Sequence, residues 1–140
     1  IELINLAKLN KKKGGKSHGS LKGITHTYYD KSNELKYKIF ILFGLPSIEF
    51  EAVLAHELFH IWLYKNQNPV SINFVEAFCN LGSAIIYENN NTHFSQIHLQ
   101  AMENETDSVY GSNYRILKNR LKKYGWEQLL KHLTHIEYKM

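Results

Sequence analysis

The chain has 140 residues, of which 44% are hydrophobic and 21% are charged, with a formal net charge of +4. This composition excludes a disordered chain and is enough for one domain with a single core. The only cysteine, Cys79, excludes an internal disulfide and a cysteine-rich zinc module. No apolar run has the length of a transmembrane helix, so we expect no membrane span. The chain starts at Ile1 rather than at a methionine, and we expect the natural N-terminus to be missing.

Basic residues concentrate in two stretches, from Lys8 to Lys22 and from Arg115 to Lys123. No aromatic residues interleave with the first cluster, and no nucleic-acid-binding motif accompanies it. A solvated basic surface is therefore the favoured interpretation, and we predict no nucleic-acid partner.

The first third of the chain is predicted to be a short helix, a loop and a β-hairpin. The apolar start and the lysine- and glycine-rich stretch that follows predict an N-terminal helix and a basic loop over residues 1–22. Residues 23–46 are predicted to be an antiparallel hairpin with strands at 23–29 and 35–43, because both are rich in β-branched and aromatic residues. The second strand is predicted to be an edge strand, which either pairs with an extended peptide or only covers the core.

Residues 47–140 are predicted to be helical, which makes the whole chain one α+β domain. The first helix is expected to start at Ser47 as its N-cap and to end before Asn66. The second, apolar nearly all round and so expected to be central, is predicted to start near Asn73 and to end at Asn89. The remaining expected elements are a helix over 93–104, a helix capped by Asp107 or Ser108 that stops at Gly125, and a last helix over 126–136.

The first of these helices carries an H-E-x-x-H box, formed by His56, Glu57 and His60. Residues four apart lie on one face of a helix, so both imidazoles point at the same spot. Two neutral histidines at this spacing suit Zn²⁺, and Glu57 is placed to act on a metal-bound water. The alternative is a core helix with two buried histidines and a glutamate, but burying three polar groups without partners is costly.

Glu76 is the candidate for the third zinc ligand. It is the one charged residue between Ser71 and Ser83, where an unpaired charge would be expensive. The alternative is a first-turn glutamate that completes a capping box with Asn73. Asn80, one turn further on, is a candidate to hydrogen-bond a ligand histidine, and Cys79 either borders the site or only packs.

Three separated stretches carry a family resemblance: residues 39–63 (IFILFGLPSIEFEAVLAHELFHIWL), 76–80 (EAFCN) and 109–125 (VYGSNYRILKNRLKKYG). Their order and spacing resemble the peptidase domain of the plant LIM-domain, ubiquitin-activated peptidases, the DA-one-like family. The resemblance covers about residues 23–135 and implies a minimal gluzincin, with a small sheet beside the two metal-site helices.

By that resemblance His56, His60 and Glu76 are zinc ligands and Glu57 is the catalytic acid/base. The chain differs from the family at Ala77, where the family has glycine, and in lacking LIM cysteines and a ubiquitin-interacting segment, so no ubiquitin partner is predicted. The resemblance implies a stand-alone version of the domain.

The predicted function is that of a zinc metallopeptidase, an endopeptidase that acts on protein or peptide substrates. Tyr110 is the first candidate to stabilise the oxyanion, ahead of Tyr114 and Arg115. The competing interpretations are a regulatory protease with a single partner, a silent zinc-stabilised interaction module, and a nucleic-acid-binding domain. The intact Glu57 favours an enzyme over a silent module.

Overall fold

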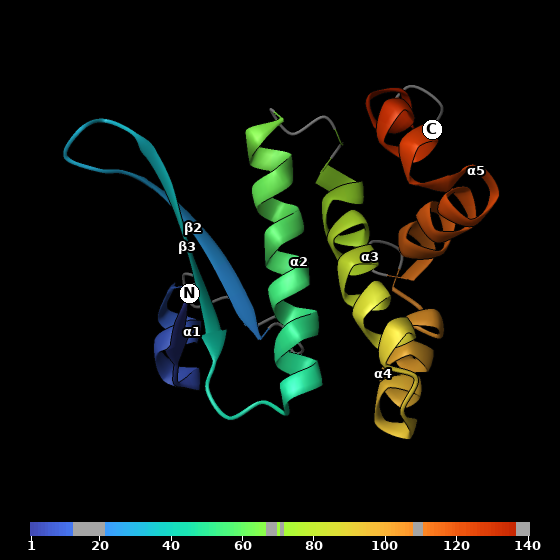
Figure 1. The fold of residues 1–140 in the computed structure, drawn as a ribbon, viewed down its shortest axis with the longest axis horizontal. Coiled ribbons are helices and arrows are strands. Elements are labelled where there is room, and N and C mark those ends of the chain that lie inside the picture. Colours follow the sequence, from blue (N-terminus) through green and yellow to red (C-terminus); the bar gives the residue numbers. More distant parts are fainter. Residues whose placement is uncertain (13–21, 67–69, 71, 108–110, 137–140) are drawn as a thin grey trace.

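A computed structural model describes residues 1–12, 22–66, 70, 72–107 and 111–136. It confirms the predicted α+β class, with a small sheet on one side of a helical body. Figure 1 shows the sheet beside α2, α3 on the other side of α2, and α4 and α5 beyond α3. The elements are β1 (Glu2–Ile4), α1 (Leu6–Lys12), β2 (Gly23–Tyr29), β3 (Leu35–Leu42), α2 (Ser47–Lys65), α3 (Ile72–Asn90), α4 (His93–Glu103) and α5 (Asn113–Ile136).

The sheet has three strands in the order β1-β3-β2, and it is mixed rather than purely antiparallel. β2 and β3 form the predicted antiparallel hairpin, with Thr25 opposite Ile39. β1 runs parallel to β3, with Leu3 opposite Ile41. The prediction that the second hairpin strand lies at an edge is therefore wrong, because β3 is central and β2 forms one edge of the sheet.

The prediction of an N-terminal helix is also wrong for the first residues of the chain. Residues 2–4 form β1, and α1 begins only at Leu6. Pairing with β3 lets Ile4 enter a small core with Leu9 and Phe40, whereas a helix over the same residues would turn away from that sheet. Hydrogen bonding and burial against a distant strand thus override the local helical pattern.

α2 occupies nearly the predicted residues but starts without the predicted cap. Pro46 takes the N-cap position, where no side-chain cap bond forms, and Ser47 is already helical. The fixed φ of proline suits this flanking position, so α2 begins directly after Pro46 without a polar cap. The helix ends at Lys65, before the breaker stretch, as predicted.

α2 and α3 pack so closely that there is no room for a side chain at Gly82. A Cβ at Gly82 would lie 2.9 Å from the carbonyl oxygen of Ala55 on α2. One residue on, the Ser83 hydroxyl donates a hydrogen bond of 2.8 Å to the carbonyl oxygen of Ala52. These contacts fix the spacing and the rotation of α3 against α2.

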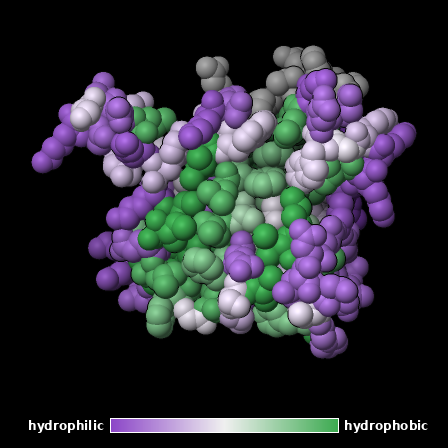
Figure 2. Space-filling view, viewed as in Figure 1, coloured by the Kyte–Doolittle hydropathy of each residue, from purple (hydrophilic) through white to green (hydrophobic). Residues whose placement is uncertain are grey.

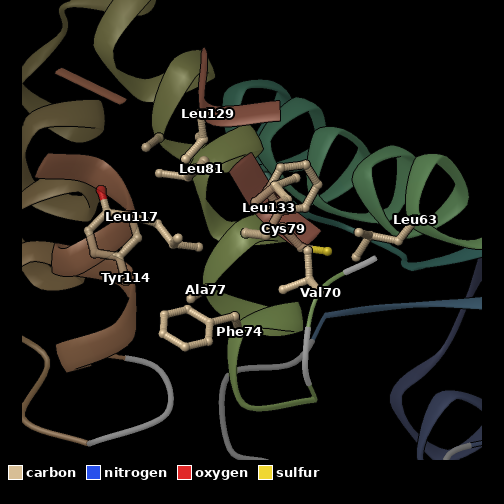
Figure 3. Packing of buried hydrophobic residues seen from close by; sticks show 12 residues of the cluster. Leu63, Val70, Phe74, Ala77, Cys79, Leu81, Tyr114, Leu117, Leu129 and Leu133 are labelled. Atoms are coloured by element: carbon tan, nitrogen blue, oxygen red, sulfur yellow. The ribbon is translucent and has the colours of Figure 1, made fainter. Parts of the chain in front are cut away.

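The main core lies on the other side of α3, where α5 packs against it (Figure 3). Phe74, Ala77 and Leu81 of α3 are at most 1% exposed, as are Tyr114 and Leu117 of α5. α3 is thus enclosed by α2 and α5, as its apolar sequence predicts.

Polar contacts stabilise the positions of the C-terminal helices α4 and α5. Thr92 and Ser95 form a reciprocal capping box at the start of α4. Gly125, with φ of 79°, breaks α5 at the predicted stop, so α5 consists of two helical segments. Lys118 on α5 forms ion pairs with Glu88 and Glu103, which ties α5 to α3 and α4.

Apolar residues gather over the middle of the face shown in Figure 2, with hydrophilic residues around its edges. Part of the exposed apolar surface comes from α2, where Leu58 is 49% exposed. Within the described parts of the chain, no helix combines the length and apolar character needed to cross a membrane.

Replacing Gly82 should show how much stability depends on the α2–α3 contact. Because the Ala55 carbonyl belongs to a helix backbone and cannot rotate away, Gly82→Val should lower the free energy of unfolding by about 3 kcal/mol. Urea denaturation measures this change. Asn89→Val, at an exposed position on the same helix, is the control and should stay within about 0.5 kcal/mol of the parent. Equal effects of the two substitutions would contradict a close contact at Gly82.

Candidate metal centre

His56 and His60 lie on adjacent turns of α2 and face the interior of the protein. Their ring centroids are 5.0 Å apart. His56 is only 7% exposed and Glu57 only 2%, whereas Leu58 on the opposite side of α2 is 49% exposed. The usual arrangement of apolar residues inside and polar residues outside is thus reversed at residues 56–58 of this helix. Such a reversal marks a site that needs buried polar groups.

Glu76, in the second turn of α3, extends its carboxylate to both histidines. Its Oε2 atom lies 3.0 Å from Nε2 of His56, and its Oε1 atom lies 3.3 Å from Nε2 of His60. Burial alone would raise the pKa of Glu76, but contacts with the two imidazoles hold it well below its usual range. The structure therefore brings together the three residues that the sequence suggests as zinc ligands.

Nε2 of His56 is buried and has no hydrogen-bond partner among the described residues, although it lies close to Glu76. An unsatisfied buried nitrogen is costly, and in native proteins it calls for an explanation such as a bound ion. A cation between the imidazoles and the carboxylate would satisfy this nitrogen, so the residues present fit a metal ion.

Cys79, one turn after Glu76 on α3, adds a further possible donor. His56, His60 and Cys79 each offer one ligand atom, and these three atoms lie within 4.8 Å of one another. The cysteine is fully buried. Burial first, and then the charges of Glu76 and Glu57, raise the pKa of its thiol well above the usual range. These three residues could hold a metal ion.

Glu57 lies next to the two histidines and is fixed by a residue that the sequence did not suggest. The hydroxyl of Thr25 on β2 donates a hydrogen bond of 3.0 Å to Oε1 of Glu57, and Oε2 lies 3.9 Å from Nε2 of His56. Thr25 lies in the strand GITHTYY, where threonine also serves as an ordinary strand former. Its role depends on how β2 packs on α2, and only the structure reveals it.

The sequence also suggested Asn80 and Tyr110 for the site. Burial lowers the pKa of the His56 imidazole, but Glu76, Glu57 and Asn80 together raise it above its usual value. Tyr110 lies outside the described residues, so its role as an oxyanion stabiliser stays a prediction. Tyr114, a weaker candidate, is 1% exposed in the core between α3 and α5, and so is not available to a substrate.

A family model described as "Protein DA1", of the DA1-like family, matches residues 7–83. The match covers more than half of the chain. The chain belongs to the DA1-like family. The matched stretch includes the sheet strands β2 and β3, the whole of α2, and α3 as far as Ser83, and so contains His56, Glu57, His60, Glu76 and Cys79.

The third stretch that suggested the family, residues 109–125, lies beyond the match. A search of the curated proteins and a search of the solved structures gave no match. The family assignment therefore rests on the half of the chain that carries the histidines and Glu76.

If the cluster holds a metal, removing one histidine should weaken binding specifically. We expect the parent to bind one zinc ion per chain, measured by equilibrium dialysis. His60→Ala should weaken binding by at least about 100-fold, more than the loss of a residue that only supports a ligand. His93→Ala removes an exposed histidine at the start of α4 and should leave the affinity unchanged. Equal affinities of the two variants would contradict the assignment of His60.

Proposed function

We propose that this protein is a zinc-dependent metallopeptidase with a gluzincin arrangement, in which His56, His60 and Glu76 hold the metal and Glu57 is the general base. The observation that carries the proposal is the group of two imidazoles and the Glu76 carboxylate, in which the buried His56 has an unsatisfied Nε2 and the buried Glu57 lies beside it. Two histidines and a glutamate are the ligand set of catalytic rather than structural zinc sites. The DA1-like family assignment supports the same proposal.

Held by His56, His60 and Glu76, a zinc ion would supply Lewis acidity, which would lower the pKa of a bound water and polarise the scissile carbonyl. Glu57 accepts the proton of the attacking water and passes it to the leaving amine. Thr25 holds Oε1 of Glu57, which leaves Oε2, the oxygen nearer His56, to make the proton transfers. Asn80, one turn after Glu76 on α3, is the candidate to orient the His56 ring.

The free edge of β2 is suited to hold an extended peptide next to Glu57. Leu42 donates its N–H to the carbonyl of Lys22, and Asp30 donates to Glu34, so the even-numbered residues of β2 direct their backbone groups at β3. The odd-numbered residues, including Thr25 and Thr27, therefore direct their N–H and C=O groups away from β3. Among the described residues no strand pairs with this edge. A peptide added here as a strand would run past the Thr25–Glu57 contact.

A cavity of about 440 Å³ lies along β2 and can receive a substrate side chain. It is lined by residues 25–28 of β2 and by Lys38, Phe40 and Tyr64. Because Thr25 belongs both to this cavity and to the contact with Glu57, a side chain in the cavity would lie near the reacting bond. The substrate class that fits is therefore a peptide or a protein segment in extended conformation.

A silent interaction module is the competing function. A site that only stabilises the fold needs metal ligands but no additional buried carboxylate held by a hydrogen bond. Glu57, which is 2% exposed and bonded to Thr25, supports catalysis over such a role.

Glu57→Gln tests the proposed mechanism directly. The amide keeps the shape of the side chain but cannot accept the proton, so zinc binding should persist while turnover falls by about 10²- to 10⁴-fold. The measurement is cleavage of a diverse peptide mixture followed by mass spectrometry, with zinc content determined for both proteins. If the zinc-loaded variant cleaves as fast as the parent, Glu57 is not the base.

Thr25→Val tests whether Thr25 positions the base. A hydrogen bond to a charged group contributes about 1.5–3 kcal/mol, so kcat should fall by about 10- to 100-fold while KM changes little. Thr25→Ser keeps the hydroxyl and should retain most of the activity. A valine variant as active as the serine variant would mean that the hydrogen bond has no role in turnover.

A further inference from the structure

Cys79 lies among the donors of the metal centre rather than only in the apolar core. Its ligand atom is within 4.8 Å of those of His56 and His60. It follows Glu76 by one turn of α3, on the side that packs against α2. Figure 3 shows its sulfur directed from α3 towards α2.

Core packing explains the burial of Cys79, but it does not explain why two imidazoles lie beside its sulfur. Ala77 and Ala84 fill the core along the same helix without offering any donor. The Cys79 sulfur lies within 4.8 Å of a ring nitrogen of each imidazole, and one of these rings carries the unsatisfied Nε2 atom. The carboxylates of Glu76 and Glu57 also act on the thiol electrostatically. Sulfur and imidazole together are a preferred ligand combination for zinc.

We propose that Cys79 is a fourth protein ligand, which closes the metal site formed by His56, His60 and Glu76. This inference rests on the proposed function for the presence of the metal, and it adds a restraint on activity. On coordination the thiol gives up its proton to solvent, so metal binding releases one proton from Cys79. Four protein ligands make a closed site, whereas catalysis needs a position for water.

The closed site predicts an enzyme that is slow rather than inactive. Zinc can expand to five ligands, so water still has access, but less than at an open position. Removing Cys79 should therefore weaken metal binding and increase turnover at the same time. Loss of a residue that merely packs in the core would not produce this combination.

Cobalt(II) is the probe for the ligand, because thiolate ligation gives an intense near-ultraviolet charge-transfer absorption that imidazole and carboxylate ligation do not. The cobalt-loaded parent should show this absorption, and cobalt-loaded Cys79→Ala should lack it. Cys79→Ser, which changes the side-chain volume little, should lack it as well and serves if the alanine variant does not fold. Glu57→Gln keeps Cys79 and is the matched control, so it should retain the absorption.

Zinc affinity and peptide cleavage complete the test. Cys79→Ala should bind zinc at least about tenfold more weakly, in line with the loss of a group that contacts the metal site. At saturating zinc it should cleave peptides several-fold faster than the parent. The double variant that carries both Cys79→Ala and Glu57→Gln should not show this increase in turnover, because the increase depends on Glu57 as the base.

The outcomes separate this inference from the proposed function. A parent that binds cobalt without the charge-transfer absorption overturns the role of Cys79 and leaves the proposed function standing. The absorption together with an alanine variant no faster than the parent overturns the restraint on activity. A parent that binds neither metal overturns the proposed function, and this inference with it.

Discussion

The close packing of α2 on α3 is the contact on which the candidate site depends. The histidines belong to α2 and Glu76 belongs to α3, so their separation is set by how near the two helices approach. Gly82 and the hydrogen bond from Ser83 allow the helix backbones to meet a short distance along from the site. A bulkier residue at Gly82 would separate the helices and draw the carboxylate away from the imidazoles. The stability of the domain and the geometry of the site therefore rest on the same contact.

The second constraint is the burial of several polar groups in a small protein. The Glu76 carboxylate lies 3.0 Å from Nε2 of His56, and this buried nitrogen has no hydrogen-bond partner among the described residues. Burying such groups opposes folding unless every partner is present. The large core between α3 and α5 and the ion pairs of Lys118 supply stability away from the site. This division explains why a 140-residue domain can carry a destabilising polar cluster on α2.

The sequence predicted the parts of the site that depend on helical spacing. His56, Glu57 and His60 lie within two turns of one helix, so their common face follows from local geometry alone. Glu76 could be suggested because it is an isolated charge in an apolar helix. Thr25 and β1 could not be found this way. Thr25 reaches Glu57 across 32 positions of sequence, and β1 pairs with a strand beyond an intervening helix and hairpin strand. Such contacts depend on tertiary packing, which no local pattern specifies.

The most direct test of this account is a crystal structure of the zinc-loaded protein, with anomalous diffraction recorded at the zinc absorption edge. We predict one strong anomalous peak between α2 and α3, within bonding distance of His56, His60 and Glu76. A zinc peak elsewhere on the protein, or no zinc between these two helices, would contradict the account.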